Sequence, residues 1–201
     1  MNAQKFRSIL LVGAPGAGKG TIGKALGVLP GFFHCSSGDI FRALDPHSEL
    51  GKSVTLYLTK GELVPDGLTV EIWEDFLQQQ VAAGRLDPAR DCVVLDGIPR
   101  NVIQARLVES VVDIVRVFHL DIANRAQLAA RLALRARAQG RSDDASPDVI
   151  QRRIQIYERE TQPILHHYGS ARVSIVDATP AAHRVLHAFL SELIAQQVVA
   201  N

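Results

Sequence analysis

The sequence predicts an α/β fold in which helices cover both faces of a parallel sheet, a three-layer α/β/α arrangement. Short apolar runs alternate with longer segments of helical periodicity along the 201 residues. This alternation is typical of parallel sheets, because each crossover between parallel strands needs a connecting segment that a helix supplies. The run 92–95 is apolar at every position, as expected of a central strand that is covered on both faces.

Five strands are expected, over residues 9–12, 32–35, 92–95, 114–120 and 173–176. One helix should follow the first strand directly, after a glycine-rich segment. The other expected helices cover residues 40–44, 48–60, 68–83, 101–110, 125–138, 147–168 and 181–198. Gly61 and Gly84 are placed to end two of them, and Pro147 to begin another. In such a sheet, ligands are expected at the carboxyl ends of the strands.

Composition limits the possible partners. The net charge is +1, so there is no electrostatic reason to expect a nucleic-acid or membrane partner. Cys35 and Cys92 lie far apart and form no C-x-x-C pair, so no zinc site is expected. No segment has the pattern of a signal peptide or is long and apolar enough to span a membrane, so a cytoplasmic location is expected. The length favours one domain with small insertions.

The glycine-rich segment Gly13-Ala14-Pro15-Gly16-Ala17-Gly18-Lys19-Gly20-Thr21 has the G-x-x-x-x-G-K spacing of a phosphate-binding loop. Glycines let successive backbone N–H groups point at one anion, and the helix that follows adds partial positive charge at its N-terminus. Lys19 is expected to reach the outer phosphates, and Thr21 to offer a hydroxyl near the metal. The loop therefore indicates a nucleoside triphosphate as ligand. Gly20 stands where Ser or Thr usually follows the lysine, and this departure indicates a particular subfamily.

More polar residues gather where ligands are expected. Residues 37–42 follow the second strand, 96–100 follow the third, and 140–144 follow a helix that carries several arginines. Any single helical arginine is most simply a solvated surface residue. Taken together, the arginines suit phosphoryl transfer, in which negative charge spreads over several oxygens and catalysis is positioning plus fixed positive charge. The pattern therefore favours a kinase that closes over two phosphorylated ligands.

Segments 13–21, 37–42, 96–100 and 140–144 resemble the four signature segments of the adenylate kinase family, in the same order. The resemblance covers nearly the whole chain. It implies a three-layer α/β/α P-loop kinase fold with a parallel central sheet, a core of residues 1–35, 66–134 and 146–201, a small helical monophosphate-binding insert at 36–65 and a short lid at 135–145. The implied reaction is ATP and AMP to two ADP with Mg²⁺, and a monomer is expected.

The resemblance also implies a role for each matching residue. The catalytic residues would be Lys19, Arg100, Arg135, Arg141 and Arg153. ATP would contact Gly16, Ala17, Gly18, Lys19, Gly20, Thr21 and Arg135. AMP would contact Ser37, Arg42, Glu62, Leu63, Val64, Gly97, Arg100, Gln104, Arg141 and Arg153. Asp96 would act on Mg²⁺ through water. Asp39 would do the same, although a carboxylate that begins a helix is an equally good interpretation of it.

Two residues depart from the family pattern, and one of them keeps an alternative open. Ile98 stands where Phe or Tyr is common, which is a packing change. Asn101 stands where adenylate kinases usually have Thr, and Asn there resembles the UMP/CMP kinase relatives, whereas Gln104 favours adenine. A UMP or CMP kinase is therefore one alternative. The other is a P-loop module that binds nucleotide without turnover, although the intact Lys19 and the arginines argue against it.

Overall fold

The protein folds around a five-stranded sheet in which all neighbouring strands are parallel, in the order β2-β3-β1-β4-β5. The computed structural model describes residues 5–140, 144 and 146–198. The strand bounds are β1 Phe6–Gly13, β2 Phe32–Ser36, β3 Cys92–Asp96, β4 Val112–Asp121 and β5 Val173–Asp177. All five predicted strands are confirmed, each slightly longer than its apolar run because ladder pairing continues beyond the apolar residues.

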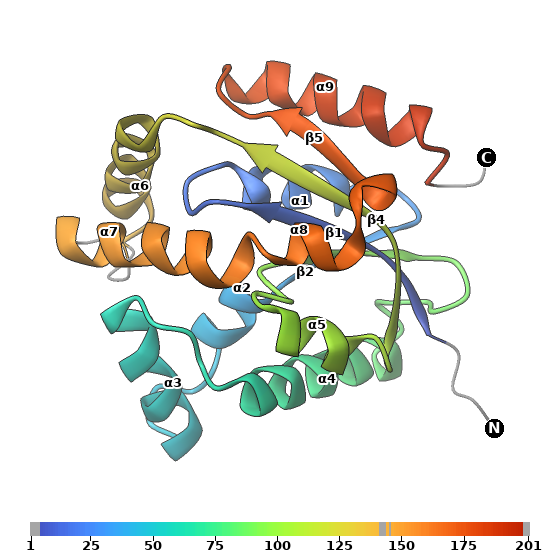
Figure 1. The fold of residues 1–201 in the computed structure, drawn as a ribbon. Helices are drawn as coiled ribbons and strands as arrows, with labels where there is room; N and C mark the ends of the chain where they lie inside the picture. Colours follow the sequence, from blue (N-terminus) through green and yellow to red (C-terminus); the bar gives the residue numbers. More distant parts are fainter. Residues whose placement is uncertain (1–4, 141–143, 145, 199–201) are drawn as a thin grey trace.

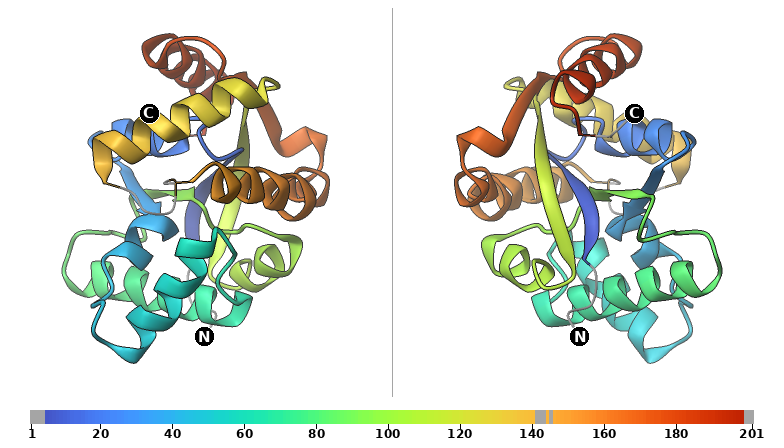
Figure 2. Two further views of the ribbon diagram at one scale, coloured as in Figure 1. Left: turned by 90° about the vertical axis from the view of Figure 1, so that its left-hand side faces the viewer. Right: turned by 90° about the vertical axis from the view of Figure 1, so that its right-hand side faces the viewer.

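The helices are α1 Lys19–Leu26, α2 Ser37–Arg42, α3 Glu49–Lys60, α4 Asp66–Ala82, α5 Val102–Val108, α6 Arg125–Gln139, α7 Pro147–Ile156, α8 Ile164–Tyr168 and α9 Ala182–Ala195. The strand arrows in Figure 1 point toward the side of the molecule where α6, α7 and α3 lie. Figure 2, left, looks at that end of the sheet. The carboxyl ends of the strands therefore open between these helices.

The side chains of β1 explain the three layers. Ile9 and Leu11 belong to a core cluster with residues of α1, α6, α7 and α9. Leu10 and Val12 belong to a second cluster with residues of α2, α3, α4, α5 and α8. Because successive side chains of a strand point to opposite faces, one strand serves both cores. This confirms the predicted α/β/α arrangement.

Side-chain caps set several helix starts. The hydroxyl of Ser36 accepts from the backbone N–H of Asp39, so α2 begins at Ser37, three residues earlier than predicted, and ends at Arg42 rather than Leu44. Four other helices have caps of the same kind: α3 is capped by Ser48, α5 by Asn101, α6 by Asn124 and α7 by Ser146.

The predicted single helix over 147–168 is wrong in its second half. α7 ends at Ile156, a π-helical turn covers Tyr157–Thr161, and α8 begins after Pro163. Pro163 has no N–H to donate, and the Gln162 N–H bonds the Tyr157 carbonyl five residues back at 2.9 Å. The proline thus breaks the regular ladder while the chain keeps its direction (Figure 1). Within the described ranges, no helix is both long and apolar enough to cross a bilayer.

Candidate active site

A cleft of about 700 Å³ opens at the carboxyl ends of β1 and β3. Its walls come from the glycine-rich loop, α2, residues 61–63, the segment after β3, α6 and α7. Three of the predicted signature segments, 13–21, 37–42 and 96–100, lie at the carboxyl ends of strands, as expected for ligand sites of a parallel sheet. The predicted residues in the lining are Gly16, Ala17, Gly18, Lys19, Gly20, Thr21, Asp39, Arg42, Glu62, Leu63, Asp96, Gly97, Arg100, Arg135 and Arg153.

The loop between β1 and α1 needs its glycines. Gly16 has φ +88° and Gly18 has φ +100°, a left-handed region that other residues rarely adopt. A Cβ on Gly16 would also lie 3.0 Å from the Leu128 carbonyl oxygen of α6, so α6 packs directly on the loop. Gly18 precedes the first residue of α1, and no side chain caps this helix. The open helix N-terminus is therefore turned toward the cleft, where an anion can bind it.

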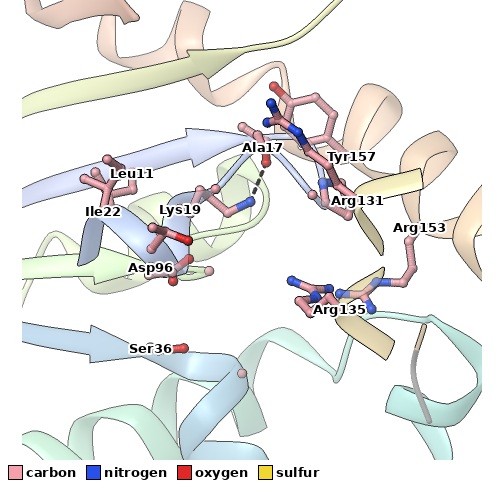
Figure 3. A pocket seen from close by; sticks show the side chains of 18 of the residues that line it. Leu11, Ala17, Lys19, Ile22, Ser36, Asp96, Arg131, Arg135, Arg153 and Tyr157 are labelled. Carbon is pink, nitrogen blue, oxygen red and sulfur yellow. Dashed lines mark hydrogen bonds between the residues drawn. The ribbon is translucent and has the colours of Figure 1, made fainter. Parts of the chain in front are cut away.

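Lys19 is held over the loop by the loop's own carbonyls. Its Nζ donates to the Gly13 oxygen at 2.6 Å and to the Ala14 oxygen at 3.3 Å. Burial lowers the pKa of Lys19 to about 8, although the nearby Asp96 carboxylate acts in the opposite direction. Figure 3 shows Lys19 and Asp96 on one side of the cleft, with Arg135 and Arg153 on the other. The lysine is thus an ammonium placed between an anionic side chain and the open space.

Asp96 ends β3 and is buried. Burial raises its pKa, but the contact with His34 and the charge of Lys19 outweigh burial, and the net pKa lies below the usual value. His34 Nε2 lies 3.5 Å from the Asp96 carboxylate, which is long for a hydrogen bond. A Cβ on Gly20 would lie 3.5 Å from the same carboxylate, so Gly20 leaves the carboxylate accessible from α1.

These residues fit a magnesium ion that arrives with a nucleotide. Mg²⁺ keeps several waters and is usually held by one or two carboxylates together with substrate phosphates, and not by an all-protein cage. Asp96 and the Thr21 hydroxyl border the same cleft as the loop. Among the residues that the structure describes, no group of three or more His, Cys, Asp or Glu side chains could form a cage. Asp39 also borders the cleft, and it is paired with Arg42 at 2.6 Å on the half-exposed face of α2.

Asp144 joins two arginines of the opposite wall. Its buried carboxylate accepts from Arg135 Nε at 2.7 Å and also binds a guanidinium N–H of Arg153. Arg135 lies on α6 and Arg153 on α7, so one carboxylate fixes two helices and two charges relative to each other. Arg100 donates from Nε to the Gly97 oxygen at 2.8 Å. The predicted Arg141 lies outside the described residues.

The predicted monophosphate side is linked by side chains. The Ser37 hydroxyl donates to the Gly97 oxygen at 2.7 Å, and a Cβ on Gly97, which has φ +82°, would lie 2.8 Å from that hydroxyl. Glu62, Leu63 and Val64 border a smaller pocket together with Gln104, which is buried. The structure therefore brings the predicted residues of this side together between α2, α3 and α5.

Sequence reasoning missed two contributors, His34 and Asp66. The ring of His34 lies in a notch on α1, where a Cβ on Gly23 would be 2.2 Å from Nε2 and a Cβ on Gly27 would be 2.8 Å from the His34 Cβ. The sequence feature that could have indicated this close contact is the pair Gly23, within α1, and Gly27, directly after it. Asp66 accepts hydrogen bonds from Asn101 and Gln104, each at 2.8 Å. No local sequence pattern could indicate this role, because the two partners lie 35 and 38 residues away.

Comparison with known proteins agrees with this geometry. Residues 11–173 match the family model described as adenylate kinase. The chain is 38% identical over 176 residues to a protein named adenylate kinase from Cyanothece sp., covering 84% of this chain and 86% of that one. It is 36% identical over 187 residues to another of that name from Mycobacterium sp. (92% and 98%), and 33% over 191 residues to one from Kocuria rhizophila (92% and 97%).

Proposed function

The chain belongs to the adenylate kinase family, and from that premise we propose how its cleft moves a phosphoryl group between ATP and AMP to give two ADP. The observation that carries the proposal is one cleft with a phosphate-binding loop on one wall and paired arginines on the other. Two phosphorylated ligands approaching from the two walls would meet between them, as the transfer requires.

On the donor wall, the backbone N–H groups of residues 16–21 would bind the ATP phosphates. Lys19 would leave the carbonyls of Gly13 and Ala14 and follow the phosphoryl group in flight. An ammonium that moves with the transferred group can contact it in the transition state, where its charge is spread over three equatorial oxygens, and so lowers the barrier. Asp96 and Thr21 would hold, through water, a Mg²⁺ that enters with ATP. When bound, that ion neutralises charge between the phosphates.

On the acceptor wall, Arg42 and Arg100 would bind the AMP phosphate, and Gln104 with Glu62, Leu63 and Val64 would surround its base. Arg135 would contact ATP, and Arg141 and Arg153 would bridge the reacting phosphates. Arginine suits this position because its planar fork binds phosphate oxygens bidentately and keeps its charge at every relevant pH. Asp144 would keep Arg135 and Arg153 ordered before the ligands arrive.

The remaining expectations belong to the proposal as well. The ligands would be ATP, AMP and ADP, with no nucleic acid and no membrane, since the net charge is only +1. The protein would act as a cytoplasmic monomer, with residues 36–65 and 135–145 closing over the core.

A coupled assay tests the acceptor. Purified protein is given ATP, Mg²⁺ and, separately, AMP, GMP, UMP or CMP, and the nucleoside diphosphates formed are measured by chromatography. We expect AMP to have the highest kcat/KM, because a site that hydrogen-bonds one base leaves buried polar groups unpaired with another. A higher kcat/KM for UMP or CMP would contradict the adenine assignment. Nucleotide binding without turnover would favour the non-catalytic module.

A further inference from the structure

In the smaller pocket, the side-chain amide of Gln104 is held by the protein itself. Both ends of the buried Gln104 amide are bonded within the protein. Its Oε1 accepts from the backbone N–H of Arg100 at 2.8 Å, and its Nε2 donates to Oδ1 of Asp66 at 2.8 Å. Asp66 is the first residue of α4, whereas Gln104 lies in α5, so the contact joins two helices around the pocket.

The two partners have fixed polarity. A backbone N–H only donates, and an ionised carboxylate only accepts. If the Gln104 amide turned over, its NH₂ group would face the Arg100 N–H and its oxygen would face the Asp66 carboxylate. Both contacts would then be repulsive, with buried polar groups left unpaired. The orientation of this amide is thus set before any ligand binds.

Asn101 braces the same carboxylate. Its Nδ2 donates to Oδ1 of Asp66 at 2.8 Å, and its Oδ1 accepts from the backbone N–H of Gln104 at 2.8 Å, which caps α5. Both ends of the Asn101 amide are therefore engaged inside the protein. The network holds the start of α4 against the start of α5.

The orientation matters because a side-chain amide can match either of two purine edges. Adenine presents a donor at its 6-amino group and an acceptor at N1. Hypoxanthine and guanine present the reverse, an acceptor at O6 and a donor at N1. A fixed amide still has one lone pair on oxygen and one hydrogen on nitrogen for a ligand, and it can match only one of these edges without turning.

We propose that Asp66 is a positioning residue for specificity, which fixes the Gln104 amide so that the acceptor site selects adenine over 6-oxopurines. The inference rests on the proposed function, in which Gln104 faces the base of the acceptor. Asp66 acts through Gln104, with Asn101 as its brace, and does not itself contact the nucleotide. Without the carboxylate, the amide can turn and accept the reverse edge.

The test compares AMP with IMP, which differ only at the 6-position and N1 of the base. The kcat/KM for each is measured at saturating ATP for the wild-type protein and Asp66→Asn. The Asn amide can present its NH₂ group to a turned Gln104, while Arg100 still favours the original orientation. We expect the AMP/IMP ratio to fall about tenfold, through a gain in kcat/KM for IMP, with the KM for ATP unchanged.

Glu71→Gln is the matched control, because Glu71 is an exposed residue of the same helix and the change removes the same charge. It should leave the ratio unchanged. Asp66→Ser is the second variant, in case Asp66→Asn folds poorly, and its hydroxyl can donate or accept. A merely structural role for Asp66 would lower kcat/KM for AMP and IMP in the same proportion.

An unchanged AMP/IMP ratio in both Asp66 variants would overturn the inference while leaving the proposed reaction intact. A wild-type protein that already uses IMP as well as AMP would overturn it too. A wild-type protein that phosphorylates neither would overturn the proposed function and this inference together, and the wild-type AMP assay distinguishes that case from the others.

Discussion

The two walls of the cleft are built on different principles. The donor wall is made of backbone, with the start of α1, which no side chain caps, bordering the cleft and Lys19 bonded to two loop carbonyls. The acceptor wall is made of charged side chains that are paired with one another, such as Arg42 with Asp39 and Arg153 with Asp144. On the donor wall, therefore, only Lys19 has to leave its present partners, whereas the charged side chains of the acceptor wall must all exchange partners when a phosphate arrives.

This difference predicts how each wall responds to substitution. The loop backbone is preorganised and costs no reorganisation at the moment of reaction. Lys19 is the one mobile charge of this wall, so its removal takes away transition-state stabilisation that nothing else on the wall supplies. A paired arginine exchanges one ion pair for another when a phosphate binds, so the net gain in free energy is small. The contribution of these arginines to transition-state stabilisation should grow only when both ligands are present and water is expelled. The substitutions below separate the two cases.

The largest effect is expected for Lys19→Met. The methionine keeps the unbranched side chain but has no ammonium to follow the phosphoryl group, so kcat should fall by orders of magnitude, roughly 10³-fold, since a charge used mainly in the transition state is lost. Circular dichroism should show that the fold is retained. Lys52→Met, which removes an exposed lysine paired with Glu49, is the control. Near-normal turnover of Lys19→Met would make the loop lysine incidental.

The next effect is expected for Arg141→Ala, an arginine of the proposed lid. Turnover should fall about a hundredfold, as for removal of one transition-state donor. The dissociation constant for AMP alone should hardly change, whereas an inhibitor that bridges both sites should bind far more weakly. Calorimetry measures both affinities beside steady-state kinetics, and Arg137→Ala on the exposed side of α6 is the control. Loss of AMP affinity in proportion to turnover would make Arg141 a ground-state ligand.

The donor wall could be predicted from the sequence because its parts are local. Nine consecutive residues make the loop, and the apolar run before it and the helix after it fix its setting. The strands were predictable for the same reason, since each is marked by its own apolar run. The helix over 147–168 was predicted too long because the periodic apolar residues outweighed Pro163, which breaks the ladder.

The acceptor wall could be predicted only as a set of residues, and its pairings could not. Asp66 meets Gln104 across 38 residues, and Thr161 donates to the Arg100 oxygen across 61. No local pattern marks such partners, because they depend on how α4, α5 and the turn after α7 pack. Asn101 illustrates the consequence. Taken alone it resembles a pyrimidine-kinase residue, but in the fold it caps α5 and braces Asp66.

A third prediction concerns pH and the donor wall. Burial lowers the pKa of Lys19 to about 8, so the free enzyme should lose the ammonium as the pH rises through that value. The kcat/KM for ATP should then fall about tenfold per pH unit above 8, because kcat/KM follows the ionisation of the free enzyme. Lys19→Arg should lack this alkaline limb in its residual activity. The same limb in that variant would assign the ionisation to another group.

Deprotonation of Lys19 does not itself destabilise the fold, so it does not produce that limb through unfolding. The unfolded chain keeps the ordinary lysine pKa of 10.5, so between about pH 8 and 10.5 its Lys19 binds more protons than that of the folded chain. Stability rises with pH wherever the unfolded state binds more protons, so Lys19 adds stability as the pH rises through this window. Denaturant unfolding at pH 8 and 9 would measure this contribution beside the kinetics.

The smallest effects are expected for two glycine-to-alanine substitutions on α1. Their free energies of unfolding measure how closely the donor wall is packed. A Cβ on Gly23 would lie 2.2 Å from His34 Nε2, so Gly23→Ala must displace the ring from its notch and from Asp96. Such overpacking costs about 1–3 kcal/mol, of which about 1 kcal/mol is offset because alanine favours the helix. We therefore expect a net loss of about 0–2 kcal/mol in the free energy of unfolding.

Gly20→Ala is the matched substitution, one turn earlier on the same helix. Its Cβ would meet only the Asp96 carboxylate, at an ordinary 3.5 Å, so the helix preference of alanine should raise the free energy of unfolding by about 0.5–1 kcal/mol. Its methyl group would also stand beside Asp96, where the proposed Mg²⁺ waters lie, so turnover should fall while stability rises. Urea unfolding of both variants gives the comparison. Equal stability of the two would mean that His34 moves out of the notch without cost, and that the donor wall is less rigidly packed than its backbone geometry indicates.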